Sequence, residues 1–143
     1  MKDIARQVAS PYATEIIWDG GVSGTGQSGK GQELAVGYEG GAWSPEHLLL
    51  LGAECSLMES FLTAAREADL QVLGYVSSGH LDLPDDPALA PRLTLRPCVV
   101  VASLDDARRA AAMLTSVARE SVAGRLLADH LHVGADIRME SSS

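Results

Sequence analysis

The chain of 143 residues has an ordinary globular composition, with 46% hydrophobic and 21% charged residues and a formal net charge of −8. This composition excludes a disordered or fibrous chain. The excess of acidic side chains disfavours nucleic acids and anionic membranes as partners, because both carry negative charge. The length predicts one compact domain over residues 1–143.

The amino-terminal third is predicted to form two strands joined by a loop. Residues 13–18 (ATEIIW) favour a strand. Residues 20–31 are mostly Gly, Ser, Thr and Gln, which predicts a mobile loop. Residues 32–39 (QELAVGYE) favour a second strand, and two glycines end it.

A long helix is expected from Ser44 to about Asp69, with Ser44 as N-cap, Pro45 in the first helical position and Glu46 in the first turn. Its apolar residues form two stripes that cover over half of its circumference: Leu48, Leu51, Cys55, Met58, Leu62 and Ala65, and Leu50, Ala53, Leu57, Phe61, Ala64 and Ala68. Such a helix is expected to be central and buried. A third face carries small or hydroxylated residues: Gly52, Ser56, Ser60 and Thr63.

The second half of the chain is predicted to contain three strands and two helices. The strands are expected at residues 72–83, 93–102 and 131–139, and the helices at 103–119 and 121–129. Pro97 suggests a bulge or an edge position in the second of these strands. Because helices and strands come in blocks rather than in strict alternation, the sequence indicates an α+β fold and not a doubly wound parallel sheet.

Two motifs suggest cofactor or metal binding, and neither is complete. Residues 24–29 (GTGQSG) match a dinucleotide-binding GxGxxG, but no helical pattern follows them, and Gly31 stands where a phosphate-binding loop needs Ser or Thr. His130 and His132 lie near Asp129 at a strand start, without a convincing set of further zinc ligands. We therefore expect no cofactor and no metal, and a surface position for both histidines.

The two cysteines, Cys55 and Cys98, are too few and too far apart for a secreted disulfide scaffold or a zinc ribbon. Residues 1–11 lack the apolar core of a secretory signal. No segment approaches the roughly 18 to 20 unbroken apolar residues that span a bilayer. We expect a soluble cytoplasmic protein that has no membrane partner.

The segment Trp43–Leu70 (WSPEHLLLLGAECSLMESFLTAAREADL) resembles the central helix of the OsmC/Ohr family of hydroperoxide-reducing proteins. The Ser-Pro-Glu start is similar to that of the family, and the order of the predicted elements matches over nearly the whole chain. The resemblance implies an α+β, two-layer OsmC-like fold in which a long buried central helix packs against an antiparallel sheet. It also implies an intertwined homodimer and a link to oxidative-stress defence.

The family site contains a reactive cysteine in this helix, a resolving cysteine near the end of the second helix, an arginine from the amino-terminal region and the glutamate of the helix start. Glu46 matches the glutamate. Aligned from Pro45 without a gap, Ser56 takes the reactive position, and Cys55 is one residue early. Ser121, in RESVAGRLL, takes the resolving position.

The arginine position is also changed, because Gly37 and Tyr38 occupy it and Lys30 is the only nearby cation. One residue is about 100° around a helix, so Cys55 is expected to point into an apolar stripe, away from Ser56. We expect Cys55 to be a small buried residue and Cys98 to belong to the core, since free cysteines are often buried.

Three hypotheses remain open. The chain forms a non-peroxidase homodimer whose interface pocket, around Glu46, Ser56 and Ser121, binds a small apolar molecule. Alternatively, it is a one-cysteine thiol peroxidase in which Cys55 acts on an organic hydroperoxide with help from Glu46. The third hypothesis is a purely structural subunit without a ligand.

Overall fold

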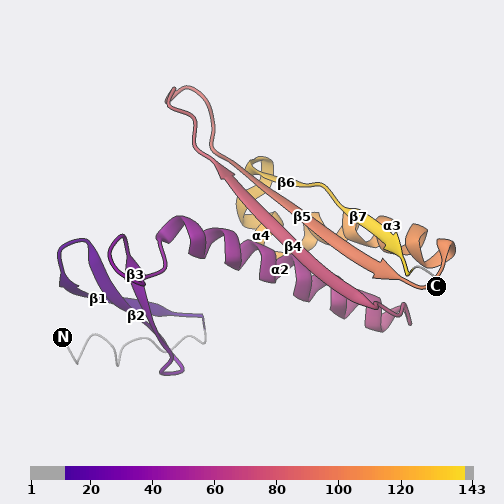
Figure 1. Cartoon of the computed structure of the whole chain (residues 1–143), viewed down its shortest axis with the longest axis horizontal. Coiled ribbons are helices and arrows are strands. Elements are labelled where there is room, and N and C mark those ends of the chain that lie inside the picture. The colour runs from indigo at the N-terminus through magenta and orange to yellow at the C-terminus, as the bar shows by residue number, and fades with distance from the viewer. Residues whose placement is uncertain (1–11, 141–143) are drawn as a thin grey trace. The chain divides into compact units, whose positions relative to one another are not determined.

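The computed structural model describes residues 12–140, and its contacts divide the chain into two compact units, residues 1–48 and 49–143 (Figure 1). The single domain expected over residues 1–143 remains a prediction. The expectation about a secretory signal in residues 1–11 lies outside the described residues.

The first unit contains a three-stranded antiparallel sheet in the order β1 (Thr14–Gly20), β2 (Ser23–Ser28) and β3 (Glu33–Gly37). The prediction of a mobile loop over residues 20–31 is therefore wrong, because residues 23–28 form the middle strand. Gly and Ser have weak strand propensity, but β2 pairs with a strand on each side. Those pairings are not visible in the local sequence.

Helix α2 (Pro45–Glu67) begins where the sequence predicts. Ser44 is its N-cap, and the backbone N–H of His47 donates to Ser44 Oγ at 3.1 Å. One of the two predicted stripes is buried in the second unit, through Ala53, Leu57 and Phe61. The other stripe is exposed only in part: Leu51 is 48% and Leu62 is 36% exposed, and Cys55 is exposed, whereas Leu48 and Met58 are half-buried and Ala65 is buried. The helix is therefore buried on one side.

By length and composition alone, α2 could also cross a membrane, and it is the one such helix among the described residues. The core helix of a soluble protein passes the same test. α2 is such a core helix on one side, because it contributes its buried stripe to the core of the second unit.

The second unit contains the strands β4 (Gly74–Asp82), β5 (Arg92–Val101), β6 (Leu131–Val133) and β7 (Asp136–Met139). β4 pairs with β5 antiparallel, whereas β6 and β7 pair with β5 parallel, so the sheet is mixed and not purely antiparallel. The predicted strand over residues 131–139 is divided at residues 134–135, because β6 and β7 pair with different parts of β5.

Pro97 lies in the central strand, so the expected edge position is wrong, and the register with β4 shows no bulge there. On the opposite side of β5, β6 pairs with residues 93–95 and β7 with residues 98–101. Pro97 falls between these two stretches. A residue without an N–H group is tolerated where a strand has no partner on one side.

Helices α3 (Leu104–Glu120) and α4 (Val122–Leu127) follow β5, and a short 3₁₀ turn, η1 (Ala128–His130), leads into β6 (Figure 1). Ser103 is the predicted N-cap of α3, and its Oγ accepts from the N–H of Asp106 at 3.1 Å. The core lies between α2, α3 and one face of β5. Its fully buried side chains include Leu57, Phe61, Leu95, Val99 and Leu114.

Candidate functional site

The two serines that the sequence places at the site meet at the amino-terminal end of α4. Ser121 is the N-cap of this helix, and its Oγ accepts from the N–H of Gly124 at 3.1 Å. Ser56, on α2, accepts from the N–H of Ala123 at 3.2 Å. Residues that are 65 positions apart in the sequence therefore bind neighbouring backbone amides.

These hydrogen bonds show how both hydroxyls are used. The first N–H groups of a helix have no partner within the helix, and side-chain oxygens commonly satisfy them. Ser121 is 3% exposed, and its hydroxyl also donates to the carbonyl of Ala118 at 3.4 Å. Ser56 is half-buried. Both serines thus act as caps that join α2, α3 and α4.

The corner between α3 and α4 is tight, and this holds Ser121 in place. A Cβ atom at Gly124 would lie 1.9 Å from the carbonyl oxygen of Ala118, which no side chain could accommodate. Gly124 therefore allows α4 to pack directly against the end of α3. Its N–H group reaches Ser121 Oγ because of this close approach.

Glu46 has a phenol as its partner. Tyr38 Oη donates to Glu46 Oε1 at 2.8 Å and lies 3.0 Å from Oε2. This hydrogen bond is the main cause that lowers the pKa of Glu46 below its usual value. The same bond raises the pKa of the Tyr38 phenol. The residue at the expected arginine position therefore contacts Glu46 but carries no positive charge.

Both cysteines are free thiols, and neither is buried in the core. Cys55 is exposed, because no other part of its unit covers that side of α2. The expectation that Cys55 is buried is therefore wrong. Cys98 is half-exposed, so its expected place in the core is also wrong. It lies between the buried residues Pro97 and Val99, so its side chain faces the opposite side of the sheet from the core.

The histidines bind neighbouring groups in the chain. His130 Nδ1 lies 2.9 Å from the carbonyl oxygen of Pro91, and Arg92 Nη2 lies 3.3 Å from His132 Nδ1. His47, which is exposed, contacts the hydroxyl of Ser44. Within residues 12–140 no three His, Cys, Asp or Glu side chains are arranged to hold a metal ion.

The GxGxxG residues do not form a phosphate-binding turn. Gly24 and Gly26 lie inside β2, and the chain continues into β3 rather than into a helix. The helix N-terminus that would face a phosphate is therefore missing from this motif.

Sequence reasoning missed two contacts of the site. It aligned Tyr38 with the arginine position but did not predict its hydrogen bond to Glu46. It also did not predict that Ser56 binds the amide of Ala123. The cap at Ser121 had a local signal, namely a serine directly before a short helix.

Neither a protein-family model nor a curated protein matches this sequence. Solved structures do match the fold. An OsmC-like protein of unknown function from Vibrio cholerae has a TM-score of 0.76 at 13% identity, over 88% of this chain and 99% of that one. An OsmC-like protein from Mycoplasma pneumoniae has a TM-score of 0.74 at 12% identity, over 93% and 99%.

The organic hydroperoxide resistance protein OhrB of Bacillus subtilis is also similar, with a TM-score of 0.64 at 14% identity, over 90% of this chain and 100% of that one. These matches confirm the expected α+β class and the OsmC-like fold. At such low identity the similarity concerns the fold and not the activity.

Proposed function

We propose that this protein is a divergent OsmC-like homodimer that binds a small apolar molecule near Glu46, Ser56 and Ser121 and has no dithiol peroxidase activity. The observation that carries this proposal is the hydrogen bond from the Ala123 amide to Ser56 Oγ. The position that the family resemblance assigns to a reactive thiol is occupied by a hydroxyl that caps a helix.

The chemistry of peroxide reduction supports the absence of that activity. A dithiol peroxidase needs a thiolate to attack the peroxide, a cation to keep the thiolate ionised and a second thiol to close a disulfide. Hydroxyls stand at positions 56 and 121, and both accept hydrogen bonds from the backbone. The partner of Glu46 is a neutral phenol.

The exposed stripe of α2 supports the homodimer. Its exposed part contains Leu51, Cys55 and Leu62, and the half-buried Met58 lies between them, so the four follow one another at spacings of four, three and four residues. A contiguous apolar surface on a soluble protein commonly marks an interaction site. Burying a leucine side chain contributes about 1.5 to 3 kcal/mol, so pairing of two such stripes supplies a substantial driving force.

Native mass spectrometry of the freshly purified protein tests the proposal. We expect a dimer that either retains a small apolar molecule or binds the neutral fluorescent probe N-phenyl-1-naphthylamine saturably. In the Leu51→Glu variant the subunits should separate, and the probe should no longer bind. A dimer that carries no molecule and does not bind the probe would favour the purely structural subunit and contradict the proposal.

The exposure of Cys55 favours a second candidate, the one-cysteine thiol peroxidase. In that reaction the thiolate takes the terminal oxygen of the hydroperoxide and becomes a sulfenic acid, while the O–O bond breaks and the alcohol leaves with a proton from water. Two external thiols then reduce the sulfenic acid to the thiol and release water, as they are oxidised to a disulfide.

Dimedone, which labels sulfenic acids, separates this candidate from the first. If the protein is a one-cysteine peroxidase, dimedone should label Cys55 well before Cys98 at a low peroxide concentration, as measured by peptide mass spectrometry. Equal and slow labelling of both cysteines would exclude it and would agree with the binding function.

A further inference from the structure

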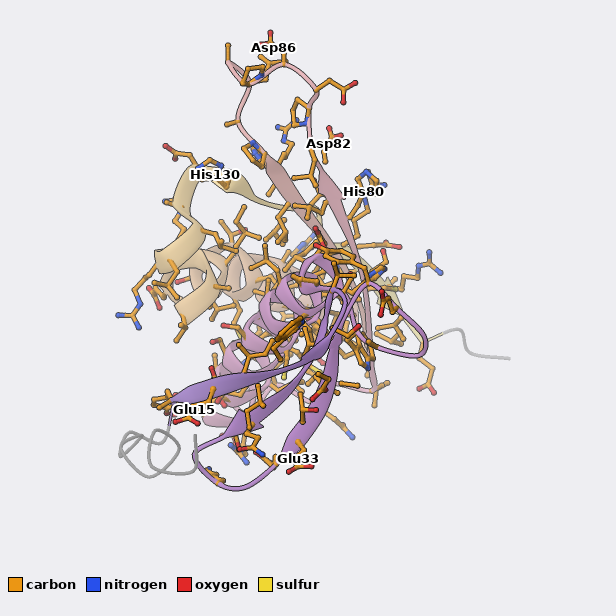
Figure 2. All side chains as sticks on the ribbon, turned by 90° about the vertical axis from the view of Figure 1, so that its left-hand side faces the viewer. Glu15, Glu33, His80, Asp82, Asp86 and His130 are labelled. Carbon is orange, nitrogen blue, oxygen red and sulfur yellow. The ribbon has the colours of Figure 1, made fainter. Side chains whose placement is uncertain are left out.

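Four polar side chains gather on the face of the second sheet that points away from the core. β4 and β5 place Ser78 directly opposite Arg96 and His80 directly opposite Thr94. Alternate residues of a strand share a face, so all four lie on one side of the sheet. The core residues Leu93, Leu95 and Val99 lie on the opposite side. His80 projects outward from the hairpin (Figure 2).

The four side chains line a hollow of about 300 Å³. Its shape follows from the pairing, because each strand contributes one long side chain and one short hydroxyl. Arg96 faces Ser78, and His80 faces Thr94, so the short residues lie on one diagonal and the long residues on the other. Gly79, which has no side chain, completes the lining.

All four lining side chains can donate hydrogen bonds, and none is a carboxylate. Among the described residues, none of these side chains has a hydrogen-bond or ion-pair partner. Beside the hollow on the same face, Arg92 contacts His132, which pairs in register with Thr94, and the carboxylate of Asp82 lies directly opposite Arg92. The lining of the hollow therefore consists of hydrogen-bond donors, although the chain as a whole carries a net charge of −8.

We propose that this hollow binds the phosphate group of a small soluble phosphomonoester. A guanidinium, an imidazole and two hydroxyls offer more donors than the two oxygens of a carboxylate can accept, and the three terminal oxygens of a phosphate match them better. The volume lies at the lower end of the range for ligand sites, which fits a phosphate with a small substituent.

The net charge of the chain favours a small soluble phosphate over the phosphate groups of nucleic acids or membranes. A net charge of −8 repels nucleic acids and anionic lipid surfaces over distances of about a Debye length. A single small phosphate carries far fewer negative charges than a nucleic acid or an anionic membrane, so the same net charge opposes its binding less. The site lies on the sheet face opposite the core, so it is separate from the helix caps at Ser56 and Ser121 and does not depend on the function proposed above.

The test measures binding to the full-length protein by NMR, with glycerol 3-phosphate, inorganic phosphate and propionate as probes at low ionic strength. We expect saturable binding of both phosphates, with shifts concentrated at Ser78, His80, Thr94 and Arg96, and much weaker binding of propionate. Arg96→Gln should weaken the phosphate affinity about tenfold or more, because a charge-assisted hydrogen bond is lost.

Arg125→Gln is the matched control, because Arg125 is an exposed arginine of the same unit on α4. It should leave the affinity unchanged within about twofold, whereas Ser78→Ala should reduce it several-fold. The proposal is overturned if Arg96→Gln and Arg125→Gln weaken binding equally, if propionate binds as well as phosphate, or if binding does not saturate. Arg96-dependent binding to phosphatidylglycerol vesicles, without binding of the soluble phosphates, would also contradict it.

Discussion

The hydroxyls of Ser56 and Ser121 have a structural role at the start of α4. Each Oγ accepts from one of two consecutive amides, those of Ala123 and Gly124, at the start of α4. A thiol is a weaker hydrogen-bond acceptor than a hydroxyl, so a cysteine at either position would cap these amides less well. Both serines therefore contribute to stability.

Replacing Ser56 by alanine should lower the free energy of unfolding by about 1 to 2 kcal/mol, because the Ala123 amide loses its partner at a partly buried position. Urea denaturation measures this change. Ser60→Ala, one turn further along the same helix, is the control and should change the free energy by less than about 0.5 kcal/mol. Equal effects of the two substitutions would mean that the cap is not formed in solution.

The bond between Tyr38 and Glu46 can be tested through the pKa of the carboxylate. Tyr38→Phe removes the donor, so the pKa of Glu46 should rise towards its usual value. An NMR titration of the Glu46 carboxyl carbon measures the shift. A pKa that is the same in both proteins would show that the phenol does not bind the carboxylate.

The same bond predicts the sign of a pH effect on stability. Because folding lowers the pKa of Glu46, the ionised carboxylate stabilises the folded state. This contribution is present above the unfolded pKa, near 4.5, and is lost as the pH falls through the lower folded value. The difference in unfolding free energy between the wild type and Tyr38→Phe should therefore disappear in acid.

At the scale of elements, α2 shows both the strength and the limit of sequence reasoning. Its start at Ser44 and its two apolar stripes could be predicted, because a cap and a 3.6-residue period are local signals. Which stripe faces the core could not be predicted. That depends on β5 and α3, which bury Leu57 and Phe61 but leave Leu51 and Cys55 exposed.

The strands show the same limit. β2 was not predicted, because its Gly-rich sequence forms a strand only between β1 and β3. The last predicted strand is divided, because two segments pair with different parts of β5. At the site, Ser56 and Ser121 could be named from the resemblance, but their shared contact with α4 depends on the tight corner at Gly124.

The exposed stripe predicts an effect on assembly. Leu51→Glu places a charge in the stripe and should convert the dimer to a monomer, as measured by size-exclusion chromatography with light scattering. Leu126→Glu is the control, because Leu126 on α4 is 79% exposed and lies outside the stripe. The stripe would not be the interface if the wild type were monomeric, or if both variants remained dimeric.

At the scale of the whole molecule, the chain has an OsmC-like fold at low sequence identity to the solved structures that share it. The matched structures cover most of this chain, yet the identity is between 9% and 18%. A fold can be retained at such identity because many sequences satisfy the same pattern of buried apolar residues. Activity depends on a few residues, and in the register that the resemblance implies, hydroxyls and a phenol stand at the positions expected for the thiols and the guanidinium.

The most direct test of this account is the rate of organic hydroperoxide consumption by the purified protein in the presence of a dithiol reductant. We predict that the wild type consumes cumene hydroperoxide no faster than the reductant alone, and that Cys55→Ala gives the same rate. Catalytic consumption by the wild type that is abolished in Cys55→Ala would contradict the account and establish Cys55 as the reactive thiol.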